Sequence, residues 1–240
     1  MDTLNNVAGN SEEALILPGD GLIPSTAANP QHDRIGVSLK NVLASDFVLP
    51  VGFHWYAFRV TYGRELEAEE LIHKQGILTY VPKRKTVKQV GEKRKKVVES
   101  MVPNLLFVLT DRKSALVLTS QPLKSLSRRK DKAPLELRFM YDHTCRNEFG
   151  RDNLVTVPHP QMVNFIRFTI EGDESIRNVT GEEIRFRQNE QVMITEGAFK
   201  GVVGRVARIN RQTCVVVGLQ QICMLATAYI PKAFLRSLDT

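Results

Sequence analysis

The pattern of hydrophobic and polar positions predicts a first folded unit of mixed type. Residues 54–61 alternate in character and are rich in aromatic and β-branched side chains, which is typical of a strand. Residues 64–75 are good helix formers with apolar positions on one side, and Gly76 follows where a left-handed residue would end the helix. Further strands are expected at 77–82 and, fully buried, at 105–109. Strands interleaved with helices indicate an α/β sandwich.

The region from 112 to 160 is harder to assign. Strands are expected at 135–141 and 154–157, and Pro160 is expected to open a helix through residue 168. The inward-facing residues of this helix are expected to be Met162, Phe165, Ile166 and Phe168.

The C-terminal part shows a different pattern. Short β-rich runs at 192–195, 201–209, 214–219 and 226–230 are separated by glycines and polar turns, which predicts a small all-β barrel. Three glycines fall where a chain that doubles back needs positive φ or close backbone approach, and a phenylalanine between them can anchor the turn. These residues are Gly197, Gly201, Gly204 and Phe199. A purely structural turn role remains the alternative.

Composition changes abruptly at two places and suggests the domain boundaries. The first 52 residues hold six acids against Arg34 and Lys40, which indicates a flexible, mildly acidic extension. An acidic, polar segment later in the chain reads as a linker. The expected organisation is an extension at 1–52, an α/β domain at 53–170, a linker at 171–185 and a barrel at 186–240.

Positive charge is concentrated in one segment. The net charge is +7, and residues 83–96 hold eight Lys or Arg against one acid, Glu92. Valines on both sides of Gly91 predict a β-hairpin with its turn at that glycine. Cations at this density repel one another, so the segment is expected either to contact phosphates or an acidic partner or to be a solvated loop. The first expected contacts are Lys93, Arg94, Lys95 and Lys96, and the second are Lys83, Arg84 and Lys85.

The sequence offers little for catalysis, metal binding or membrane insertion. Its three cysteines form no CxxC pair, its five histidines are scattered singly, and no phosphate loop or GxSxG elbow occurs. No apolar run approaches the roughly 20 residues that span a bilayer, and the N-terminus does not resemble a secretory signal. A cytoplasmic protein without enzymatic activity, cofactor, metal or membrane contact is expected.

Two blocks of the sequence resemble a known family. Trp55-Tyr56, Gly63, Tyr80-Val81-Pro82 and the run from Val102 to Val108 are together similar to the N-terminal (NGN) domain of the NusG family. The run from Val192 to Val206 resembles a KOW motif. The resemblance covers residues 53–240 and is strongest to specialised paralogues of the UpxY and RfaH type. It implies an NGN-type α/β sandwich, with an antiparallel sheet and flanking helices, followed by a small SH3-like KOW barrel.

This resemblance implies a transcription elongation and antitermination factor that binds the clamp helices of bacterial RNA polymerase. Such a protein would suppress pausing or termination at chosen operons, such as capsular polysaccharide loci. The matching polymerase-binding positions are Tyr56, Val102, Leu105 and Phe107, with Thr119 and Ser120 near the opposite side of the DNA channel. Leu105 departs from the family, which usually carries an aromatic residue there. Plain core packing is the alternative for the apolar positions.

The resemblance also implies contact with DNA of the elongation complex. Positions that match single-strand contacts in RfaH-like proteins are Arg59, Thr61, Tyr62 and Arg64. Arginine and tyrosine can stack on or hydrogen-bond to a flipped base. A surface loop without a DNA role remains open here. For the basic hairpin, upstream duplex DNA is the first candidate partner.

KOW barrels of this family recruit further factors, Rho or the ribosomal protein S10, and the sequence does not choose between them. The β-branched run 215–217 favours a permanent barrel over the helical alternative known in RfaH. A monomer is expected. The competing interpretation is a KOW-containing RNA-binding or ribosome-associated protein.

Overall fold

The computed structural model describes most of one folded unit. The chain divides into Met1–Asp33 and Arg34–Thr240, and the described residues all belong to the second unit. They are residues 37–240 without positions 62, 91–92, 124–133, 147–151, 171–172, 183, 210, 220–221, 228 and 239–240. None of the helices in this described part is long and apolar enough to cross a membrane.

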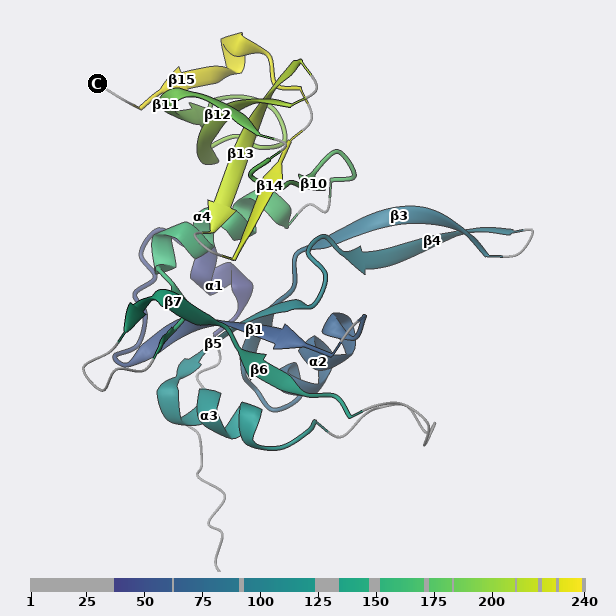
Figure 1. Ribbon diagram of the computed structural model, residues 1–240, viewed down its shortest axis with the longest axis vertical. Helices are drawn as coiled ribbons and strands as arrows, with labels where there is room; N and C mark the ends of the chain where they lie inside the picture. Colours follow the sequence, from purple (N-terminus) through teal and green to yellow (C-terminus); the bar gives the residue numbers. More distant parts are fainter. Residues whose placement is uncertain are drawn as a thin grey trace, which may run out of the picture. The chain divides into compact units, whose positions relative to one another are not determined.

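An antiparallel sheet forms the centre of the α/β part (Figure 1). Its strand order is β2-β5-β1-β6, and β9 also pairs with β1. Because β5 lies between β2 and β1 and its first six residues are buried, the expected buried central strand is confirmed. The strands are β1 (Phe53–Val60), β2 (Leu78–Tyr80), β5 (Leu105–Asp111), β6 (Leu137–Phe139) and β9 (Thr156–Val157). Two further strands, β7 (Tyr141–Arg146) and β8 (Asp152–Leu154), pair with each other.

The described part of the chain contains four α-helices beside these strands. They are α1 (Leu39–Leu43), α2 (Glu65–His73), α3 (Arg112–Ser120) and α4 (His159–Thr169). Helix α2 is followed by Gly76 with φ of 79°, as its sequence predicts. In α4, the four expected inward residues are all fully buried. Helix α3 was not foreseen; it begins after Asp111, whose carboxylate accepts from the backbone N–H groups of Lys113 and Ser114.

Side chains of the central strands alternate between two separate cores. Trp55 and Phe107 belong to the core that contains α4, whereas Tyr56 and Leu106 belong to the core that contains α2 and α3. Successive residues of a strand point to opposite faces, so neighbouring positions in β1 and β5 contribute to different cores.

Residues 37–52 differ from the flexible extension expected for 1–52. Val42 of α1 is fully buried, and Phe47 lies 5.5 Å from His159 of α4 between ring centroids. The Arg167 guanidinium donates to the carbonyl oxygen of Leu43 at 3.0 Å. Residues 37–52 are rich in apolar side chains that pack against the core containing α4, and an acid count over residues 1–52 does not reveal them. The acidic residues before position 37 lie outside the described part.

A six-stranded antiparallel sheet forms the C-terminal barrel, in the order β10-β14-β13-β12-β11-β15. The strands are β10 (Arg177–Asn178), β11 (Arg185–Ile194), β12 (Val203–Ile209), β13 (Gln212–Leu219), β14 (Cys223–Ala226) and β15 (Leu235–Ser237), with a short 3-10 helix at Lys232–Phe234. The expected linker 171–185 contributes β10, because Ile176 and Val179 are buried and the backbone pairs with β14. The strand expected at 226–230 lies earlier, at β14.

Helix α4 contacts the barrel directly. The Asn164 side chain accepts from the Val203 N–H at 2.8 Å and donates to the Val203 carbonyl oxygen at 2.7 Å. The rings of Phe168 and Phe199 lie 5.3 Å apart between centroids. One apolar core therefore runs from the sheet through α4 into the barrel.

Candidate functional site

The basic segment forms the expected hairpin. Strands β3 (Lys83–Val90) and β4 (Lys93–Ser100) pair antiparallel along their whole length and form a sheet of their own (Figure 1). Eight residues of strand span about 26 Å. The described residues of this segment form paired strands and not the solvated loop of the alternative interpretation. The turn at 91–92 lies outside the described residues.

Two glutamates hold the proximal part of this hairpin. The Glu99 carboxylate accepts from Arg84 at 2.7 Å and is also paired with Lys88. These hydrogen bonds, first from Lys88 and then from Arg84, lower the pKa of Glu99. At the base, Glu69 of α2 pairs with Lys83 at 2.6 Å. Three of the eight cations are therefore paired within the protein, with two carboxylates between them.

The remaining cations of the hairpin are exposed. In the part of the chain that the structure describes, none of these five takes part in an ion pair. They are Lys85, Lys93, Arg94, Lys95 and Lys96. All four cations expected to contact nucleic acid first are thus available at the surface.

The apolar residues expected to bind polymerase are buried in this conformation. Val102, Leu105 and Phe107 have exposed fractions of 6%, 1% and 0%. Phe107 packs edge-on against Phe165 of α4, with ring centroids 5.7 Å apart. The structure therefore places these three side chains in the core and not on an open face.

Tyr56 lies on the opposite face of the sheet from these residues. It belongs to the second core, where its ring lies 6.1 Å from that of Phe139 between centroids. Burial raises the pKa of its hydroxyl. The structure does not bring Tyr56 together with Phe107. Tyr56 is opposite Val108 in the register and Phe107 is opposite Ala57, so the two side chains point to opposite faces of the sheet.

Thr119 and Ser120 occupy the last turn of α3. Their hydroxyls donate to the carbonyl oxygens of Leu116 at 3.0 Å and Val117 at 2.8 Å, which satisfies the end of the helix. Leu116 and Val117 themselves are large apolar residues with exposed fractions of 48% and 60%. The sequence analysis missed this exposed apolar pair because it did not assign α3.

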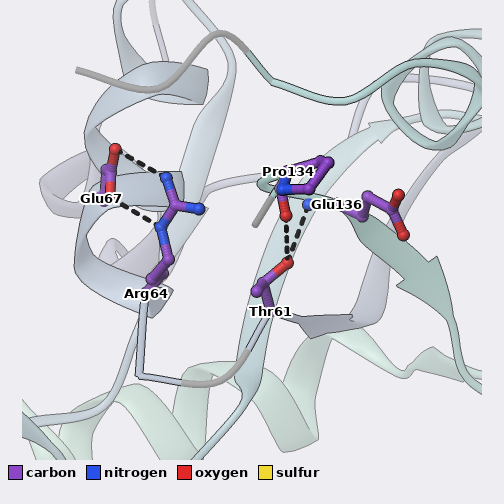
Figure 2. A network of polar contacts seen from close by, with 5 residues as sticks. All are labelled: Thr61, Arg64, Glu67, Pro134 and Glu136. Carbon is purple, nitrogen blue, oxygen red and sulfur yellow. Dashed lines mark hydrogen bonds and ion pairs between the residues drawn. The ribbon is translucent and has the colours of Figure 1, made fainter. Parts of the chain in front are cut away.

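Two of the expected single-strand contacts are engaged within the protein (Figure 2). The Thr61 hydroxyl donates to the Pro134 carbonyl oxygen at 3.0 Å and accepts from the Glu136 N–H at 2.9 Å. Arg64 forms a bidentate pair with Glu67, at 2.9 and 3.0 Å. These contacts position the turn between β1 and α2, so the structure gives both residues a scaffolding role.

Arg59 differs from these two residues because it is exposed. It stands near the end of β1, between Leu105 of β5 and Arg138 of β6 in the register. Tyr62, the fourth residue expected here, lies outside the described part. Arg59 is therefore the one described member of this group with an exposed side chain.

The barrel glycines have the backbone roles that the sequence predicts. Gly197 and Gly201 have φ of 81° and 84°, in the left-handed region. A Cβ atom on Gly204 would lie 2.5 Å from a Val215 methyl carbon and 2.7 Å from the Val216 carbonyl oxygen. Phe199 is 7% exposed and anchors the turn in the core. Both physical expectations, positive φ and close approach, are confirmed.

A buried glutamate holds the proline-asparagine turn and was missed by the sequence analysis. Glu65 is 5% exposed, and its carboxylate accepts a hydrogen bond from the Asn104 N–H. Asn104 itself has φ of 62°, which a residue with a Cβ atom rarely adopts. Because Glu65 and Asn104 are far apart in the sequence, only the fold brings them together.

No group of three or more potential metal ligands gathers within the described residues. Cys214 and Cys223 are free thiols. Burial raises the pKa of Cys223 to about 12 and also raises that of Cys214, so neither thiol is activated as a nucleophile.

Comparison with known proteins identifies one region. Residues 53–135 match the family model described as transcription termination factor nusG, a range that includes β1 to β5, the hairpin, α2 and α3. No curated protein matches the chain. Among solved structures, one titled for domain interaction in Thermotoga maritima NusG is similar to this chain, with 16% sequence identity and a TM-score of 0.37. The alignment covers 78% of this chain and 98% of that chain. A TM-score this low does not establish a shared fold for the whole chains. Over residues 53–135, the chain is therefore similar to the family of the transcription termination factor NusG.

Proposed function

We propose that this protein binds bacterial RNA polymerase during elongation and suppresses pausing or termination. The observation that carries the proposal is the NusG family match over residues 53–135, which contains both the basic hairpin and the proline-asparagine turn. A barrel with KOW-type glycine geometry follows, and its sheet already includes β10 at Arg177–Asn178. The role is one of binding by a cytoplasmic monomer and needs neither catalysis nor a cofactor.

The polymerase contact involves two regions of the α/β part. The clamp helices bind near Val102, Leu105 and Phe107; because Phe107 is held by Phe165, this contact requires α4 to shift. The second region is the end of α3 around Thr119 and Ser120. There the exposed Leu116 and Val117 add apolar area, worth about 25 cal/mol per Å² before the cost of association.

The protein also contacts the DNA of the elongation complex. The five exposed hairpin cations support binding to upstream duplex DNA, since phosphate contacts release counterions. Exposed Arg59 supports a contact with the displaced strand. Thr61 and Arg64 support that surface by holding the turn beside it.

The barrel recruits a second factor, Rho or ribosomal protein S10. Tyr229, a large side chain with an exposed fraction of 57%, offers an anchor for such a partner. The strands that carry the β-branched run support a permanent barrel, with no helical alternative.

The protein acts at particular operons, as UpxY-type and RfaH-like paralogues do, and capsular polysaccharide loci are the proposed targets. The sequence block around Trp55 and the closing residues after Ala226 support this assignment. Exchange of leader sequences between operons tests it, because an operon-specific factor acts only with its own leader.

Transcription in vitro on the protein's own leader template tests the main proposal. Addition of the protein is expected to raise readthrough and shorten pauses, and purified core polymerase is expected to retain it at low ionic strength. Unchanged readthrough together with no retention would contradict the proposal. Copurification with ribosomal subunits instead of polymerase would favour the ribosome-associated alternative.

A further inference from the structure

We infer that the β3–β4 hairpin binds duplex DNA with one defined face, and that its other face remains turned toward the protein or solvent. This inference rests on the proposed DNA contact and specifies which side chains make it. We call the two sides the open face and the paired face. Between residues 84 and 99, the open face consists of Lys85, Val87, Gln89, Arg94, Lys96 and Val98. Lys83 and Ser100 lie on the same side at the base of the hairpin, where both are half-buried and Lys83 pairs with Glu69. The paired face consists of Arg84, Thr86, Lys88, Lys93, Lys95, Val97 and Glu99.

The strand register determines these two faces. Residues directly opposite each other in an antiparallel pair lie on the same face, and neighbours along a strand lie on opposite faces. Lys85 is opposite Val98, Val87 is opposite Lys96, and Gln89 is opposite Arg94. The contacts of Glu99 agree with this assignment, because its partners Arg84 and Lys88 both lie on the paired face.

Exposure separates the two faces. All six residues of the open face are exposed, and its two valines have exposed fractions of 53% and 49%. On the paired face, the proximal residues Arg84, Thr86, Val97 and Glu99 are half-buried. Between residues 84 and 99, only the open face is therefore exposed at every position, whereas the paired face is exposed only in its distal half, at Lys88, Lys93 and Lys95.

Charge separates them in the same direction. The open face carries Lys85, Arg94 and Lys96 and no acid. On the paired face, the Glu99 carboxylate pairs with two cations, offsets one of their charges and would repel phosphates nearby. Lys93 and Lys95 remain there, both in the distal half of β4.

The composition of the hairpin selects duplex DNA among nucleic acids. Residues 83–100 contain no aromatic side chain, so the hairpin lacks the stacking platform that single strands need. A two-stranded ribbon fits the major groove of B-DNA, about 12 Å wide, whereas the major groove of duplex RNA is deep and narrow. Gln89 and Arg94, opposite each other on the open face, can bond to base edges, while Lys85 and Lys96 reach phosphates.

Two triple variants with equal loss of charge test the inference. The open-face variant is Lys85→Gln/Arg94→Gln/Lys96→Gln, and the paired-face variant is Lys88→Gln/Lys93→Gln/Lys95→Gln. Fluorescence anisotropy measures binding of the full chain to a short duplex DNA at several salt concentrations. Circular dichroism checks that both variants remain folded.

The open-face variant is expected to bind about tenfold or more weakly, and its log-log salt dependence should be shallower by roughly 2 to 3, about 0.9 per lost phosphate contact. The paired-face variant should lose only about threefold through weaker long-range attraction, with a change in slope below about 1. Equal losses in the two variants would overturn the inference. Binding of single-stranded DNA or duplex RNA by the wild-type chain as tightly as duplex DNA would overturn it as well.

Retention by core polymerase separates this inference from the proposed function. If polymerase retains the protein but both variants bind DNA equally, the face assignment fails and the proposed function stands. If polymerase does not retain the protein but the two variants differ as expected, the proposed function fails and the face assignment stands.

Discussion

The two regions proposed to bind partners differ in how their side chains are used. Six of the eight cations of the β3–β4 hairpin are exposed, and five of these six have no ion-pair partner among the described residues. The apolar residues Val102, Leu105 and Phe107 are buried, and Phe107 contacts Phe165 of α4. Charge density therefore predicted accessibility correctly, whereas apolar character could not distinguish an interface from a core. The reason is that desolvation excludes unpaired charges from the interior, while apolar side chains are stable in either place.

The largest expected effect comes from removal of a buried ring. Phe107→Ala is expected to lower the free energy of unfolding by about 3–5 kcal/mol, because the substitution leaves a cavity against Phe165. Denaturant unfolding measures this change. Val98→Ala, at a residue with an exposed fraction of 49%, is the control and should stay within about 0.5 kcal/mol. If Phe107→Ala leaves the free energy of unfolding unchanged but abolishes retention by polymerase, Phe107 acts as an interface residue and the contrast with the exposed cations fails.

A close approach in the barrel gives the next effect. Gly204→Ala is expected to cost about 1–3 kcal/mol, because the added Cβ would lie 2.5 Å from a Val215 methyl carbon and the strands must separate. Thermal unfolding followed by circular dichroism measures the loss. Gly181→Ala, where no atom lies within 4 Å of the added Cβ, serves as the control and should leave the unfolding midpoint nearly unchanged. Equal midpoints for the two variants would contradict the close approach.

Thr61 provides a smaller test of a scaffolding role. Thr61→Val removes a hydroxyl that bonds to Pro134 and Glu136, at an expected cost of about 1.5 kcal/mol. Thr61→Ser keeps the hydroxyl and should lose less. Urea unfolding compares the two. If the serine variant is no more stable than the valine variant, the hydroxyl does not hold this turn, and a direct DNA role for Thr61 gains support.

The smallest effect concerns the ion pairs of Glu99. Glu99→Gln is expected to cost at most about 1 kcal/mol at neutral pH, as for other partly exposed pairs. Hydrogen bonds from Lys88 and Arg84 lower the pKa of Glu99, so its contribution is present above the unfolded-state value and is lost as pH falls through the folded-state value. The difference between wild type and variant should therefore shrink below about pH 4. Unfolding curves at several pH values measure it, and a difference that persists in acid would contradict the assignment.

The structure confirms the elements whose signals are local and strong. The buried run of β5, the apolar side of α4 and the two hairpin strands β3 and β4 lie where the sequence predicts them. Helix α3 was missed because its nine residues carry exposed Leu116 and Val117, which blur the amphipathic pattern. Strand β10 was missed because a two-residue strand in an acidic segment has no periodicity to detect.

The missed residues of the candidate site share one property, which is that their partners are distant in the sequence. Glu65 binds the backbone at Asn104, and Asn164 binds the backbone of Val203. A polar side chain in a helix gives no local sign that it will meet such a partner. The same holds for Thr61, which was expected to contact DNA because its position matches such contacts in RfaH-like proteins, and whose partners are Pro134 and Glu136.

The sequence by itself determined the alternation of β1 and β5, the positions where glycine is needed, and the segment where positive charge gathers. These properties depend on neighbouring residues and on the backbone φ that each residue type can adopt. Only the tertiary structure decided that Tyr56 and Phe107 serve different cores, that residues 37–52 pack against the sheet, and which face of the hairpin stays open. Which face of a strand is buried depends on the distant segments that pack against it. Strand alternation alone does not determine which of the two faces that will be.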